Sequence, residues 1–94
     1  MVVAACVITL NLRGVSSLKE KRRIVKSILA RLTQQFNVAG AEIEHQDVWQ
    51  TAVIALVTVG NDTRNLHSLL EKSVAWLETN RPDVPIDAYT IEFL

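Results

Sequence analysis

The stretch VVAACVITLNLRGVSSLKEKRR, at residues 2–23, holds a β-strand, a turn and the start of a helix, and it decides the fold. Residues 2–12 are apolar at both even and odd positions, which is typical of a strand at the centre of a sheet. Residues 13–16 form the predicted turn. The hydroxyl of Ser17 can accept a hydrogen bond from an unpaired helix N–H, and Glu20 completes a capping box. The stretch therefore predicts a central strand followed by a helix.

The predicted helix is amphipathic and extends to about Phe36 or Asn37. Apolar side chains recur along it at intervals of three and four residues, as expected for a helix that packs one face against a sheet. This predicted buried face comprises Leu18, Val25, Ile28, Leu29, Leu32 and Phe36.

Two strands joined by a hairpin are predicted next. Residues 38–45 predict a strand whose side chains alternate, Ala41 and Ile43 on one face and Glu42 and Glu44 on the other. The connection at residues 46–50 is too short for a crossover, so it predicts a hairpin. The third strand, at residues 51–59, is again apolar on both faces.

The rest of the chain predicts one more helix and one more strand. Asp62 is a suitable N-cap, and the second helix has a buried stripe at Leu66, Leu69, Leu70, Val74 and Leu77. A loop at residues 82–85 leads to a fourth strand at residues 86–94. The order βαββαβ, with right-handed crossovers, predicts one ferredoxin-like α+β domain over residues 1–94. Its four-stranded antiparallel sheet has both helices on one face, and strands one and three are central.

Composition limits the classes of protein to consider. The chain has 94 residues and 49% apolar side chains, enough for one modest hydrophobic core. No apolar run reaches the ~20 residues that span a bilayer, so no membrane partner is expected. The apolar start has no positive leader, which favours a strand over a signal peptide. The single Cys6 excludes an intramolecular disulfide, and we expect a cytoplasmic location.

Charge is segregated along the chain although the formal net charge is zero. Residues 1–37 contain seven Lys or Arg side chains and one acid, whereas residues 38–94 contain three Lys or Arg side chains and nine acids. Such asymmetry indicates an anionic partner for the N-terminal part.

Several short segments, spread over most of the chain, resemble the YlxP-like family of small bacterial proteins, a domain of unknown function. The matching segments are Ser17-Leu18-Lys19-Glu20-Lys21-Arg22, Phe36-Asn37-Val38, Ala41-Glu42, Gln46-Asp47 with Trp49-Gln50, and Asn61-Asp62. The resemblance implies a ferredoxin-like fold. It also implies a genomic association with transcription-termination, translation-initiation and ribosome-maturation factors, but it carries over no catalytic residue.

The first helix carries the candidate anion-binding or RNA-binding site. At ~100° per residue, one stripe beside the apolar face holds Lys19, Arg22, Arg23 and Lys26, and Lys21 lies on the opposite flank. Cations early in a helix oppose its dipole, so helix stability alone does not favour them there. They suit phosphate binding. The alternative is a solvated face, or pairing with acids such as Glu42 and Glu44.

A second candidate surface is the face of the sheet that two helices leave uncovered. On it we place the self-association candidates Val53, Ala55, Val57 and Val59, with Val3, Ala5 and Val7 of the first strand. An apolar patch of this kind favours a homo-oligomer. The central strands offer no aromatic side chains for stacking bases, so RNA would be bound through its phosphates.

An enzyme is not expected. Arg13-Gly14-Val15 follows the first strand, where acylphosphatases of this fold bind phosphate, but it is not a clear phosphate loop. His45 and His67 lack the Cys/His clusters of a zinc site, so we expect no metal and no cofactor. Three hypotheses remain: a binding protein for RNA or the ribosome, a homo-oligomeric structural module, and a small-ligand regulatory domain.

Overall fold

The structure, a computed structural model, describes residues 1–45 and 47–94. Gln46, the first residue of the predicted hairpin connection, lies outside the described residues. The elements along the chain are β1 (Val2–Asn11), α1 (Leu18–Gln35), β2 (Ala39–Glu44), β3 (Thr51–Gly60), α2 (Thr63–Asn80) and β4 (Ile86–Phe93). The predicted βαββαβ order is confirmed, and each predicted element lies within a few residues of its observed bounds.

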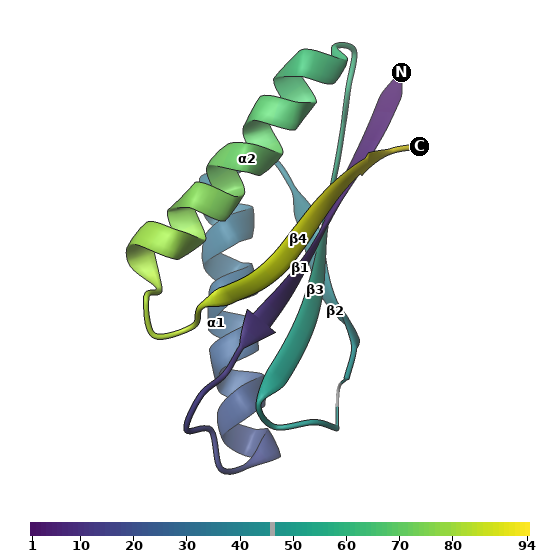
Figure 1. Cartoon of the computed structure of the whole chain (residues 1–94). Helices are drawn as coiled ribbons and strands as arrows, with labels where there is room; N and C mark the ends of the chain where they lie inside the picture. Colours follow the sequence, from purple (N-terminus) through teal and green to yellow (C-terminus); the bar gives the residue numbers. More distant parts are fainter. Residues whose placement is uncertain (46) are drawn as a thin grey trace.

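The four strands form one sheet in the order β2-β3-β1-β4, and each neighbouring pair is antiparallel. Both helices lie on the same side of the sheet, and the other side is uncovered by helices (Figure 1). The two ends of the chain meet at one end of the sheet, where the backbone N–H of Leu94 donates to the carbonyl of Val3. The prediction of a ferredoxin-like fold with β1 and β3 in the centre is confirmed.

The core lies between the helices and the even-numbered residues of β1 and β3. Ala4, Cys6, Ile8 and Leu10 of β1 are fully buried, and the facing residues of β3 are Ala52, Ile54 and Leu56. The helices contribute Val25, Ile28, Leu32, Leu66, Leu70, Val74 and Leu77. The odd residues of the two strands pair with each other and point to the opposite face. This alternation explains why both strands are apolar throughout.

The helix caps match their prediction with one difference. The Ser17 hydroxyl accepts the backbone N–H of Glu20 at 3.1 Å, and the Asp62 carboxylate accepts those of Arg64 and Asn65. However, the Glu20 carboxylate accepts the N–H of Ser16 at 3.4 Å. In a capping box this carboxylate would accept the N–H of Ser17, so the observed contact lies one residue earlier in the chain.

Leu29 lies on the predicted buried face of α1, where it is half-buried and packs against the core. One detail of the predicted pattern is wrong. In β2 the register shifts between Glu42 and Glu44, so that Glu42 is opposite Ile54 but Glu44 is opposite Val53. Residues opposite each other share a face, so the two glutamates do not lie on the same face. A bulge of this kind leaves no mark in the alternation of side chains.

Replacement of Ile28 by Ala tests the position of the core. Ile28 is fully buried between α1 and the sheet, so Ile28→Ala should lower the free energy of unfolding by about 2–5 kcal/mol. Urea denaturation measures the change. Ser27→Ala, on the exposed side of the same helix, is the matched control and should change stability by less than about 0.5 kcal/mol. Equal effects of the two substitutions would contradict the assigned helix face.

Candidate functional site

Four cations of the predicted anion-binding stripe are on the surface of α1. Lys19, Arg22, Arg23 and Lys26 are all exposed. In the described part of the chain, the ion pairs are Lys21–Glu42, His67–Glu71 and Arg81–Asp83, and none of them involves these four side chains. These four cations are therefore exposed and form no ion pair among the described residues.

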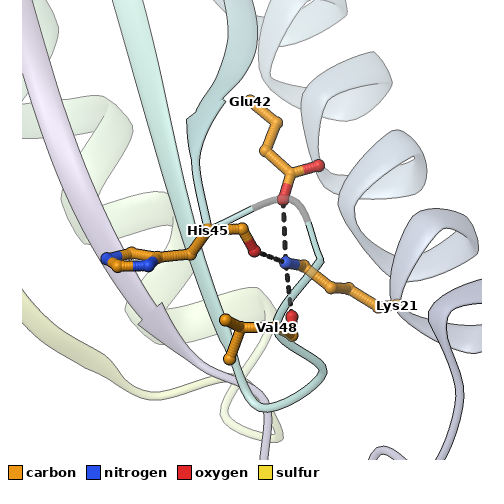
Figure 2. A network of polar contacts seen from close by, with 4 residues as sticks. All are labelled: Lys21, Glu42, His45 and Val48. Atoms are coloured by element: carbon orange, nitrogen blue, oxygen red, sulfur yellow. Dashed lines mark hydrogen bonds and ion pairs between the residues drawn. The ribbon is translucent and has the colours of Figure 1, made fainter.

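Lys21, the fifth predicted member, is not part of this surface. Its side chain is fully buried, and its ammonium group donates to the backbone carbonyls of His45 and, at 2.6 Å, of Val48. It also forms an ion pair with Glu42 at 3.0 Å. Figure 2 shows Lys21 reaching from α1 to Glu42 on β2 and to the hairpin that follows it. The prediction that Lys21 binds an anion is therefore wrong, because three oxygens of the protein already surround its charge.

The buried ammonium group fixes the β2–β3 hairpin to the start of α1. His45 has a φ of 57°, a left-handed conformation that non-glycine residues adopt infrequently, and its carbonyl faces Lys21 while its imidazole points away (Figure 2). The sequence contains a signal for this role. Lys21 lies four residues before Val25 and seven before Ile28, so helical spacing places it within the buried stripe.

A groove runs between α1 and the edge strand β2, next to the exposed cations. It has a volume of about 470 Å³, and its lining comprises Arg22, Val25, Lys26, Leu29, Ala30, Thr33, Gly40 and Glu42. Gly40 allows the helix to approach the strand closely, because a Cβ at this position would lie 3.0 Å from Cδ2 of both Leu29 and Leu56. The groove therefore combines an apolar floor with two of the four exposed cations.

The uncovered sheet face presents most of the predicted self-association candidates. Val57 and Val59 are 40% and 53% exposed, and Ala55 is half-buried. Ile43, 43% exposed, lines a shallow hollow with Ala55 and Val57 on this face. Val53 is only 5% exposed, so the prediction that it is available to a partner is wrong. The exposed apolar patch is therefore centred on the C-terminal half of β3, which includes Val57 and Val59.

Two further titratable side chains, Cys6 and Tyr89, lie close enough to Glu71 to feel its charge. Burial, with a smaller effect of the nearby Glu71 carboxylate, raises the pKa of the Cys6 thiol to about 11, which keeps it protonated near neutral pH. Glu71 also accepts a hydrogen bond from the Tyr89 hydroxyl, which raises the pKa of Tyr89.

Among residues 1–45 and 47–94, no group of three or more His, Cys, Asp or Glu side chains is arranged to hold a metal ion. Neither described helix is long and apolar enough to cross a membrane.

The fold and these surfaces define a ferredoxin-like α+β domain with a cationic first helix and an open sheet face. The family model of a protein of unknown function, DUF503, matches residues 3–90. The chain is also 35% identical over 63 residues to the uncharacterized protein YlxP of Bacillus subtilis (strain 168), with 67% of this chain and 68% of YlxP covered. The chain belongs to the DUF503 family, as the resemblance implied.

Removal of the Lys21 charge tests its structural role. Lys21→Met keeps most of the apolar stem but leaves two carbonyls and the Glu42 carboxylate without their ammonium partner. We expect a loss of about 2–4 kcal/mol in the free energy of unfolding, between the penalties for an unsatisfied polar group and for a broken buried ion pair. Lys19→Met removes an exposed charge of the same type and is the control. Chemical denaturation of both variants should separate them clearly, and equal stabilities would refute this role.

Proposed function

We propose that this protein is a cytoplasmic, non-enzymatic binding protein that contacts the phosphates of RNA, alone or on the ribosome, through α1. The observation that carries the proposal is the exposure of Lys19, Arg22, Arg23 and Lys26 on one helix without an ion-pair partner among the described residues. Phosphate oxygens are strong acceptors for such cations, and each contact releases counterions from the nucleic acid.

The position of these cations supports a functional role over a purely structural one. Lys19 lies in the first turn of α1, where the positive end of the helix dipole disfavours another cation, and Arg22 and Arg23 follow in the second turn. Lys21 alone is required by the packing, because it is buried. The stability of the fold therefore gives no reason for the other four side chains to be basic.

The uncovered sheet face supports phosphate contacts over base stacking. An RNA-recognition motif stacks bases on aromatic side chains of its two central strands. Here the outward positions of β1 and β3 carry no aromatic side chain; they are Val3, Ala5, Val7, Thr9, Asn11, Thr51, Val53, Ala55, Val57 and Val59. Recognition through α1 would therefore depend on RNA shape and charge.

Substitution of the four cations tests the proposal. Replacing Lys19, Arg22, Arg23 and Lys26 by Gln should preserve the fold, because all four are exposed and Gln is a good helix former. Affinity for ribosomal RNA should fall roughly tenfold or more. The slope of log affinity against log salt should become shallower by about 0.7 for each phosphate of a single strand that the variant no longer binds. Fluorescence anisotropy titrations at several salt concentrations measure both effects, and circular dichroism checks the fold.

The matched control removes Arg64 and Lys72, two exposed cations of α2, by substitution with Gln. This variant should bind RNA with nearly unchanged affinity and salt slope. The proposal fails if wild type binds neither naked ribosomal RNA nor isolated ribosomal subunits, or if the α2 variant loses as much affinity per charge as the α1 variant.

A second candidate function is self-association through the uncovered sheet face. The observation in its favour is the exposure of Val57 and Val59 on a face that carries mostly Ala and Val along β1 and β3. A twofold contact brings the same surface of two copies together, and an apolar surface without charge at its centre is complementary to itself. This candidate is compatible with RNA binding, because α1 lies on the other side of the sheet (Figure 1).

Introduction of one charge tests self-association. Val57→Glu places a carboxylate on the uncovered face, where burial in an interface without a partner is costly. The variant should sediment as a monomer at tens of micromolar, an order of magnitude suited to an ordinary interface, while wild type sediments as a dimer or larger assembly. Gln34→Glu adds the same charge on exposed α1 and should keep the assembly. A strictly monomeric wild type would exclude this candidate.

A further inference from the structure

The groove between α1 and β2 has features that RNA binding does not use. Its lining includes only two of the four exposed cations, Arg22 and Lys26, while Val25, Leu29 and Ala30 give it an apolar wall. It also opens beside an edge of the sheet. We propose that this groove binds an extended acidic segment of a partner protein, which pairs with β2 as a fifth strand.

The edge of β2 is open to such a strand. β2 is the first strand in the sheet order and pairs with β3 on one side only, so part of its backbone N–H and C=O groups faces away from the sheet. Five of its six residues are exposed, and the first three are Ala39, Gly40 and Ala41. These small side chains place no bulk in the path of an added strand. The register shift after Glu42 ends the regular edge, so the pairing segment is short.

The side chains around the groove determine the chemistry of the segment. Alternate residues of an added strand point to the helix side of the sheet, and there they meet the groove. Lys21 pairs with Glu42 and Leu29 packs near Gly40, so α1 and β2 run antiparallel. Arg22 therefore lies level with the Glu42 end, and Leu29 and Ala30 lie level with the Gly40 end. The expected segment has an acidic and an apolar side chain two residues apart.

The charges of the groove favour an acidic occupant. Arg22 and Lys26 are exposed and have no ion-pair partner among the described residues, whereas the carboxylate of Glu42 is paired with Lys21. A carboxylate on the incoming strand would meet two cations one helical turn apart. Lys19 and Arg23 are not among the groove residues. The peptide and RNA surfaces thus overlap at Arg22 and Lys26 and differ elsewhere.

Selection from a random library of displayed ten-residue peptides is the first arm of the test. The full chain is the bait, and peptides that bind the support without the protein are removed. The retained peptides should carry acidic and apolar residues two positions apart. No enrichment over an unselected library, or enrichment of basic sequences, would overturn the proposal.

Binding of the most enriched peptide to the isotopically labelled protein, followed by NMR, locates the site. The backbone amides of residues 39–42 and the groove side of α1 should shift. Affinity should fall about tenfold or more in Arg22→Glu/Lys26→Glu, because two attractive charge pairs become repulsive. A peptide with Lys in place of its acidic residue should recover binding to this variant. Shifts confined to the uncovered sheet face would refute the assigned site.

Matched variants separate this proposal from RNA binding and from self-association. Ala30→Trp fills the groove and should abolish peptide binding while RNA affinity is kept; Ser27→Trp, exposed on α1 outside the groove, should affect neither. Lys19→Gln/Arg23→Gln should weaken RNA binding only. If Ala30→Trp instead dissociates a dimer of wild type, the groove is occupied by a second copy and the proposal is wrong. The proposal is also wrong if Ala30→Trp lowers RNA affinity and leaves peptide binding unchanged.

Discussion

The buried ammonium group of Lys21 is the interaction on which the arrangement of α1, β2 and the following hairpin depends. An ammonium group removed from water needs partners for its charge and its protons. Glu42 and the carbonyls of His45 and Val48 supply them from two sides (Figure 2). These contacts hold the hairpin against the start of the helix, even though residues 43–45 and 47–50 are exposed and contribute little to the core. One side chain thereby sets the position of the edge strand relative to the cationic face.

A second constraint comes from the number of helices. Two helices on one side of a four-stranded sheet bury the even residues of β1 and β3, and the odd residues of the same strands stay on the other side. Apart from Asn11 at the end of β1, those odd residues are Ala, Val and Thr, and Val and Thr favour strands. The strands are thus more apolar than a half-solvated sheet requires. This excess of apolar side chains is the physical reason for proposing self-association through the outer face.

The fold could be predicted from the sequence because its signals are local and agree with one another. The apolar run of β1, the cap at Ser17 and the periodicity of α1 each indicated the same arrangement, and the sheet order followed from the short hairpin and the right-handed crossovers. Three features could not be found in this way. The bulge in β2 depends on pairing with β3, the burial of Val53 depends on tertiary contacts, and the pairing of Lys21 depends on a hairpin that follows 24 residues later. Each arises from partners that are distant in sequence.

The candidate site shows how helical phase can separate structural from functional charge. Lys21, Arg22 and Arg23 are consecutive, but successive side chains project about 100° apart around the helix. Lys21 therefore points into the core, Arg22 into the groove beside β2, and Arg23 lies exposed outside that groove. A basic run read only as net charge would assign these three residues one role. Because the Lys21 contacts hold β2 and the hairpin beside α1, they fix the two sides of the groove relative to each other. The structural cation thus preorganises the site that its neighbour would use, and loss of binding in a Lys21 variant would not by itself show that Lys21 contacts the partner.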